Sequence, residues 1–224
     1  MPAADCERLI DGFLAQPVNA MSSLAFVVVG VLVPVVVRRR LGVPTAITRA
    51  FSFALVIVGI GSVAFHGPGG PVADWVHDGS ITVLLVLIVA TEIGYRAGWS
   101  ARQLLLGWAV ASTALIVVEW IWPIVGDPLN APLALFAVLG AVGPQLRRRV
   151  SRPPDGRGKA VLTGIAMLGT GAVVMLLSRT NGPLCAPEGL IQGHAIWHVL
   201  AATGLGVYTA AWSPSTNRLP RVPL

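Results

Sequence analysis

Seven apolar stretches alternate with polar segments along the 224 residues of the chain. Each approaches the roughly 20 residues that a helix needs to cross the hydrocarbon core of a bilayer, although the third and the fifth are shorter. None shows the alternation of apolar and polar residues that is typical of barrel strands, the other structure that spans bilayers. We therefore predict an all-α membrane protein, a bundle of seven transmembrane helices, within residues 20–37, 47–65, 79–93, 104–122, 131–146, 161–177 and 190–212.

The composition is that of one domain inside a membrane. Hydrophobic residues make up 54% of the chain and charged residues only 12%, with a mean hydropathy of +0.75. A soluble domain carries about twice that charged fraction. We expect an outer N-terminal segment at residues 1–19, a single seven-transmembrane domain at residues 20–212, and a disordered cytoplasmic tail at residues 213–224.

Basic residues gather on one side of the predicted bundle. Of the 16 lysines and arginines, 14 fall in segments on the same side as the C-terminus, and only Arg8 and Arg179 fall on the other. Because cytoplasmic loops are enriched in basic residues, we place the C-terminus in the cytoplasm and the N-terminus outside. Since these basic segments alternate with membrane spans, the net charge of +6 does not point to a nucleic acid partner. Arginine outnumbers lysine 15 to 1, which suggests GC-rich coding and a bacterial plasma membrane.

Three of the four histidines lie at the outer ends of predicted helices. His194 and His198 are four residues apart at the start of the last helix, so their side chains share one helix face. His66 closes the second helix at the same side of the membrane. Three protein ligands and one open position are the usual arrangement of a catalytic zinc ion. We therefore predict a zinc site formed by His66, His194 and His198, open toward the outer face.

Two further polar side chains are predicted at the depth of these histidines. Asp78, at the head of the third helix, is our candidate for the carboxylate that moves protons, with Asp74 as the alternative. Ser62, one turn before His66, is expected to hydrogen-bond an activated water or a developing oxyanion. We expect His77 to lie at the membrane interface, with its side chain pointing away from that of Asp78.

The only two cysteines, Cys6 and Cys185, both map to the outer side. Disulfides persist in such oxidising surroundings. A bond between them would join the N-terminal segment to the segment that enters the last helix, and two free thiols are the alternative.

These residues, in this order and spacing, resemble the signature of the alkaline ceramidases. That family belongs to a superfamily of seven-helix metal hydrolases that also includes the adiponectin-type receptors. The resemblance implies a zinc amidase that cleaves the N-acyl bond of ceramide-like lipids, with the site residues in the roles given above, and a disulfide between Cys6 and Cys185. It rests on Ser62-x-x-x-His66, Asp78, His194-x-x-x-His198, Cys6-Glu7-Arg8, Gln16-Pro17-Val18-Asn19 and Ser22-Ser23, and it spans residues 5 to 212.

The resemblance also raises the question of a calcium site, which some members of the family carry in the N-terminal segment. The matching residues here are Glu7, with Asp5, Asp11 and Asn19 as further candidates. Gln16 stands where an acidic residue is common in the family, and the loss of a carboxylate weakens a site for a hard cation. The case for calcium is therefore weaker than the case for zinc.

Two functions fit these observations. The first is an intramembrane zinc-dependent amidase acting on ceramide-like or other N-acylated lipids that it takes from the membrane. The second is a seven-helix membrane receptor or regulator with a structural zinc site. A transporter fits less well, because the sequence shows no internal repeat and no interrupted mid-membrane helices. The exact lipid, the direction of the reaction and the oligomeric state stay open.

Overall fold

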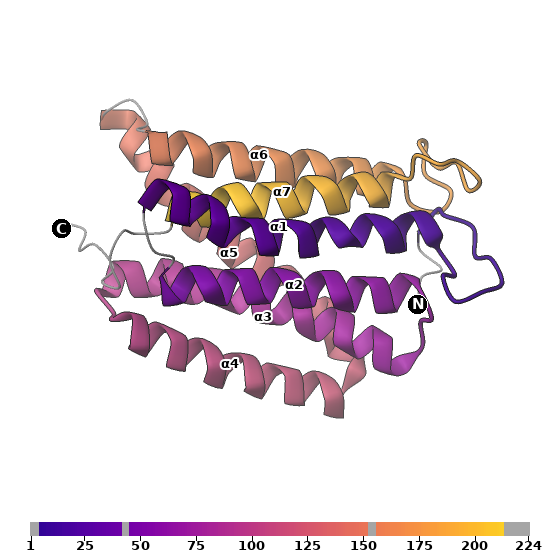
Figure 1. Ribbon diagram of the computed structural model, residues 1–224, viewed down its shortest axis with the longest axis horizontal. Coiled ribbons are helices and arrows are strands. Elements are labelled where there is room, and N and C mark those ends of the chain that lie inside the picture. Colours follow the sequence, from indigo (N-terminus) through magenta and orange to yellow (C-terminus); the bar gives the residue numbers. More distant parts are fainter. Residues whose placement is uncertain (1–4, 42–44, 152–155, 213–224) are drawn as a thin grey trace.

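Seven α-helices form one bundle in the computed structural model, which describes residues 5–41, 45–151 and 156–212 (Figure 1). The predicted all-α class and the number of helices are confirmed. A short 3-10 helix, η2 (Pro123–Val125), joins the fourth helix to the fifth. The helices are α1 (Pro17–Leu41), α2 (Ala46–His66), α3 (Pro71–Ala97), α4 (Ala101–Ile121), α5 (Gly126–Ser151), α6 (Gly156–Leu177) and α7 (Gly193–Trp212).

Local signals set the helix ends at the short connections. The Thr45 side chain accepts a hydrogen bond from the backbone N–H of Thr48 and caps the start of α2. Ser100 and Gln103 form a reciprocal capping box at the start of α4. Gly98 follows α3 with a φ of 67°, in the left-handed region that glycine adopts at least cost. These caps turn the chain sharply and keep consecutive helices adjacent.

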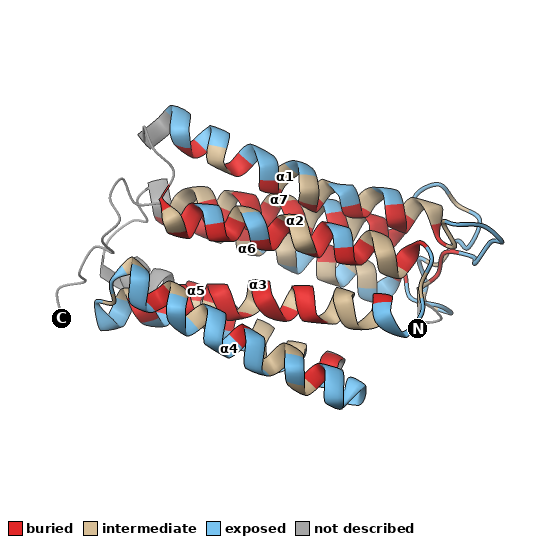
Figure 2. Ribbon diagram, turned by 60° about the horizontal axis from the view of Figure 1, so that its bottom comes forward, coloured by how far each residue is buried: buried red, intermediate tan, exposed pale blue. Residues whose placement is uncertain are grey.

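The outward surface of the bundle is apolar, as expected of helices that face lipid. Six helices are long and apolar enough to cross a membrane. Helix α7 falls outside that group because His194 and His198 lower the hydropathy of its first turns, yet it lies alongside α1 and α6 (Figure 1). Figure 2 shows that α4 is largely exposed, and the exposed side chains on it include Leu106, Val110 and Val117. A soluble monomer rarely exposes such a continuous apolar surface.

The helices pack in two groups, which meet where α2 contacts α3 and where α5 contacts α6. Helix α1 contacts α2 and α7, and α7 also contacts α6, whereas α3 contacts α2, α4 and α5. Small residues permit the closest approach, because a Cβ at Gly164 of α6 would lie 2.6 Å from the carbonyl oxygen of Gly204 of α7. This contact seats α7, which carries two of the histidines, firmly against α6.

The two ends of the bundle differ in character. The N-terminal segment, the end of α2, the start of α3 and the start of α7 lie together at one end, and the described C-terminal residues lie at the other (Figure 1). Arg38, Arg39 and Arg102 lie near helix ends at the end of the bundle that carries the described C-terminal residues. Which end faces the cytoplasm stays a prediction. The tail at residues 213–224 lies outside the described residues.

Candidate metal centre

Three imidazole rings converge at the end of the bundle that carries the N-terminal segment. His66 is the last residue of α2, and His194 and His198 lie in the first two turns of α7. One ring nitrogen from each histidine lies within 4.8 Å of the others. His66 is fully buried and His198 nearly so, whereas the His194 side chain is 18% exposed. The three residues that the sequence singles out are therefore brought together, and they could hold a metal ion.

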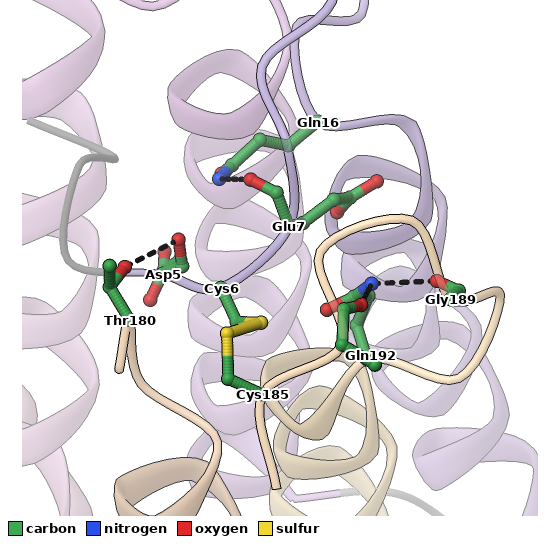
Figure 3. Close-up of a disulfide and its surroundings, with 9 residues drawn as sticks. Asp5, Cys6, Glu7, Gln16, Thr180, Cys185, Gly189 and Gln192 are labelled. Carbon is green, nitrogen blue, oxygen red and sulfur yellow. Dashed lines mark hydrogen bonds between the residues drawn. A yellow bond between two sulfur atoms is a disulfide. The ribbon is translucent and has the colours of Figure 1, made fainter. Parts of the chain in front are cut away.

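Contacts with the N-terminal segment place partners beside Nδ1 of His66 and His194. His66 Nδ1 lies 2.7 Å from Gln16 Oε1, and the Gln16 amide nitrogen donates to the carbonyl oxygen of Glu7 (Figure 3). An amide oxygen only accepts hydrogen bonds, so His66 carries its hydrogen on Nδ1 and keeps a free lone pair on Nε2, as a metal ligand requires. His194 Nδ1 lies 3.0 Å from Asp5 Oδ1, an ion-pair contact that falls short of hydrogen-bond geometry.

The same tautomer follows for His198 from a different kind of contact. Its Nδ1 lies 2.9 Å from Ser22 Oγ and 3.3 Å from Ser23 Oγ. Both serine hydroxyls donate to the carbonyl oxygen of Asn19, at 2.9 and 2.8 Å. Because a hydroxyl has only one hydrogen, both serines can only accept from His198. His66 and His198 therefore both keep a lone pair on Nε2.

The unsatisfied polar atoms of the cluster fit a metal ion. His66 Nε2 is buried and has no hydrogen-bond partner. Leaving a buried polar atom unpaired costs about 1–3 kcal/mol, and coordination would relieve that cost. Three neutral imidazoles with one position left open match the donor set of a catalytic zinc ion. Within the described ranges, no other group of three or more His, Cys, Asp or Glu residues could hold a metal.

Ser62 lies inside the cluster, as its position one turn before His66 predicts. Its buried Oγ is 3.3 Å from His198 Nε2 and 2.8 Å from Ser23 Oγ. Since the hydrogen of Ser23 is bound by Asn19, the single hydrogen of Ser62 serves either Ser23 Oγ or His198 Nε2.

Asp78 is placed differently from what we expect from the sequence. Its Oδ1 lies 2.9 Å from His77 Nδ1, so the prediction that His77 points away from Asp78 is wrong. The His77 ring stacks on Phe65, with ring centroids 4.5 Å apart, and its centroid lies 6.4 Å from that of His66. Gly61 of α2 explains this, because a Cβ there would lie 3.2 Å from the Cα of His77. The close approach of α3 to α2 brings His77, which contacts Asp78, against the Phe65 ring.

The face of α3 that carries Asp78 is directed toward α4 and α5. Thr82, one turn after Asp78, hydrogen-bonds the Glu119 carboxyl group and the side chain of Asn130. Asn130 also donates to the backbone carbonyl oxygen of Asp78. Among the described contacts, none joins Asp78 or Asp74 directly to the three histidines.

Three of the four residues proposed for calcium lie near one another, whereas Asp5 faces the histidines. Both carboxylate oxygens of Glu7 accept backbone N–H groups at the start of α1, from Val18 at 2.7 Å and Asn19 at 2.8 Å. Glu7 thus acts as a cap for α1, where a negative charge is favourable. The Asn19 side-chain amide is buried and has no hydrogen-bond partner among the described residues. A calcium site in this segment stays a prediction.

The sequence analysis groups Asp5 with the candidate calcium ligands, whereas in the structure its carboxylate contacts two of the three imidazoles. Oδ1 lies 3.0 Å from His194 Nδ1, and Oδ2 lies 3.9 Å from His66 Nδ1. Burial by itself raises the pKa of Asp5, but contact with His194, together with His66 and Arg179, outweighs it and sets the pKa below its usual value. The carboxylate is therefore ionised beside the cluster. A lone acid in an irregular segment gives no periodic signal that would indicate this contact.

The predicted disulfide is confirmed and fixes the N-terminal segment over the site. Cys6 and Cys185 are bonded, with Cα atoms 5.4 Å apart, and Asp5 and Glu7 lie on either side of Cys6 (Figure 3). The Arg8 N–H donates to the carbonyl oxygen of Pro187. The segment before α1 and the segment before α7 are thus held together at the end of the bundle.

Removing this disulfide should destabilise the protein. For the double variant Cys6→Ser/Cys185→Ser, we expect a free energy of unfolding lower by about 2–4 kcal/mol, because the bond closes a long loop in the unfolded chain. Denaturant unfolding in detergent, with the oxidised parent protein as the reference, measures the difference. Equal stability of the two proteins would show that the other contacts hold the segment unaided.

Comparison with known proteins extends the resemblance seen in the sequence. A family model described as Ceramidase matches residues 6–216, which include both cysteines and all three clustered histidines. No curated protein matches the chain. The match covers well over half of the chain, so the resemblance is confirmed at the level of the family.

Proposed function

Since this chain belongs to the ceramidase family, we propose that it is an intramembrane zinc-dependent amidase that hydrolyses the N-acyl bond of ceramide-like or other N-acylated lipids. The convergence of His66, His194 and His198 within 4.8 Å is the observation that carries the proposal. The buried Nε2 of His66 has no hydrogen-bond partner, which fits a nitrogen that is free to bind an ion. We take zinc as the metal because three neutral imidazoles suit it.

Zinc in such a site supplies Lewis-acid activation of water and of the scissile carbonyl group. Ser62 then has a defined part in our scheme. Its buried hydroxyl lies 3.3 Å from His198 Nε2, where it hydrogen-bonds the attacking water or the developing oxyanion.

We assign proton transfer to Asp78 acting together with His77. The carboxylate accepts the Nδ1 hydrogen of His77, which orients the ring and favours a proton-accepting Nε2 on its other side. The ring stacks on Phe65, next to His66 in the chain. The pair takes a proton from the attacking water and returns it to the leaving amine. Asp78 therefore keeps its predicted role as the proton-handling carboxylate, with His77 as an intermediary that sequence reasoning missed.

The position of the cluster suits a lipid amide. The histidines lie at the end of a bundle whose outward surface is apolar (Figure 2). The amide bond of an N-acylated lipid lies near the headgroup level, while its acyl chains extend into the hydrocarbon. We propose a multi-pass protein of a bacterial plasma membrane, with this end of the bundle at the outer face.

Metal analysis and hydrolysis assays on the same preparation test the proposal. The protein is purified in detergent, its zinc content is measured, and fluorescent ceramide and other N-acyl lipids are offered as substrates. We expect one zinc per chain and release of fatty acid, loss of both after treatment with a chelator, and recovery when zinc is added back. A folded protein that neither contains nor takes up zinc would contradict the proposal.

A receptor or regulator with a structural zinc site is the second candidate. The observation that favours it is that the described contact of the Asp78 carboxylate is with His77 and not with any of the three clustered histidines. In that case the metal would stabilise the bundle, and no N-acyl lipid would be turned over. The effect of replacing Asp78 separates the two functions, as set out in the Discussion.

A further inference from the structure

We propose that Asp5 is a positioning residue of the metal centre, which holds the His194 ring in the orientation and tautomer that present Nε2 to the metal. The inference rests on the proposed function, because it assumes that the three histidines bind zinc. It concerns a role that neither the calcium hypothesis nor the match to the family assigns to this residue.

The contact itself has the chemistry that the role requires. Asp5 Oδ1 lies 3.0 Å from His194 Nδ1, and the side chain is only 9% exposed. The contact is an ion pair that falls short of hydrogen-bond geometry, and a negative charge beside Nδ1 favours the hydrogen on that atom, which leaves the lone pair on Nε2 and makes the ring a stronger donor to a metal. Such carboxylate–histidine–metal arrangements are common around zinc, where the outer partner orients the ligand.

His194 is the histidine that needs such a partner most. His66 and His198 are buried and are held by packing and by neutral partners, namely Gln16 for the first and two serines for the second. The His194 side chain is 18% exposed, so fewer neighbours restrict its ring. Among the described residues, Asp5 is also the only acid in an ion-pair contact with these histidines.

The backbone of Asp5 is fixed independently of the metal. Asp5 forms an antiparallel bridge with Arg179, and its carbonyl oxygen accepts a hydrogen bond from the Thr180 hydroxyl at 3.1 Å (Figure 3). The next residue, Cys6, is bonded to Cys185. These contacts place the carboxylate beside His194 before any metal binds, and such preorganisation is what an outer-shell group requires.

Zinc affinity of matched variants tests the inference. Asp5→Ala removes the carboxylate, Asp5→Asn keeps its shape but removes the charge, and Asp11→Asn is the control, an exposed acid in the same segment. Competition with a chromophoric chelator measures the affinity of each purified protein for zinc. We expect Asp5→Ala to bind zinc about 10–100-fold more weakly than the parent, Asp5→Asn to fall between them, and Asp11→Asn to equal the parent.

A second measurement separates positioning from a merely structural role. Thermal unfolding is followed with and without zinc, and we expect the zinc-dependent rise of the midpoint to shrink in Asp5→Ala while the midpoint of the zinc-free protein stays close to that of the parent. Should Asp5→Ala fail to fold, Asp5→Asn decides. Parental zinc affinity in a folded Asp5 variant would overturn the inference and leave the proposed function intact. Failure of the parent itself to bind zinc would overturn the proposed function.

Discussion

His198→Ala should abolish zinc binding and the hydrolysis of N-acyl lipids together. The residue is nearly fully buried, and its Nε2 lies on the same side as the free nitrogen of His66. Two remaining imidazoles bind zinc far more weakly than three, and the reaction has no other source of Lewis acid. We expect zinc content to fall to background and fatty-acid release to fall to the limit of detection.

The control for this variant is Thr203→Ala, five residues further along α7. Its hydroxyl donates only to the backbone carbonyl oxygen of Val199, so its loss leaves the histidines untouched. Zinc content and activity should match those of the parent. If His198→Ala keeps both zinc and turnover, the metal is held elsewhere and the assignment of the centre fails.

Asp78→Asn should lower kcat by about 10²–10⁴-fold while zinc stays bound, since that is the usual contribution of a positioned acid–base group. Asparagine keeps the shape of the side chain but cannot accept a proton from His77. Because no described contact joins Asp78 to the three histidines, the ligands themselves should be unaffected. Zinc content and the rate of hydrolysis, measured on the same sample, check both parts of the expectation.

Asp74→Asn is the matched control, one turn earlier in α3. It also tests the alternative carboxylate that the sequence leaves open, because its turnover should remain at the parental level. The opposite pattern, with activity lost in Asp74→Asn and kept in Asp78→Asn, would reverse the assignment. If neither the parent nor Asp78→Asn turns over any N-acyl lipid while both bind zinc, the receptor or regulator with a structural zinc site becomes the better description.

The helices are predictable from the sequence because burial in lipid demands long apolar stretches, although their ends are not. Helix α3 begins at Pro71, eight residues before the predicted apolar run. Its first two turns carry Asp74, His77 and Asp78, so hydropathy overlooks residues that are nevertheless helical. Conversely, Leu190 and Ile191 are apolar but lie exposed before α7. Hydropathy reports contact with hydrocarbon, whereas caps and prolines determine where a helix begins.

The three histidines are predictable for a related reason. His194 and His198 share a helix face by periodicity, and the alternating direction of successive spans brings the end of α2 to the same level. The positions of Asp5 and Gln16 have no such rule, because they lie in an irregular segment whose path is fixed by the Cys6–Cys185 bond. His77 is missed because the approach of α3 to α2 depends on Gly61, whose packing partner cannot be read from the sequence.

The site therefore has two parts. Helices position the three histidines, and the irregular N-terminal segment adds Asp5 and Gln16. The first part supplies the three candidate ligands, and the second places Gln16 and Asp5 beside Nδ1 of His66 and His194. Neither residue has a periodic relation to the histidine that it contacts. This explains why a short segment outside the bundle bears on chemistry at the helix ends.

X-ray absorption at the zinc edge, on protein purified without added metal, tests the central claim most directly. The account predicts one zinc per chain with imidazole nitrogens as its protein ligands, and loss of that signal in His66→Ala. Protein that is folded and oxidised at Cys6 and Cys185 but lacks zinc, or holds it without imidazole ligands, would contradict the account.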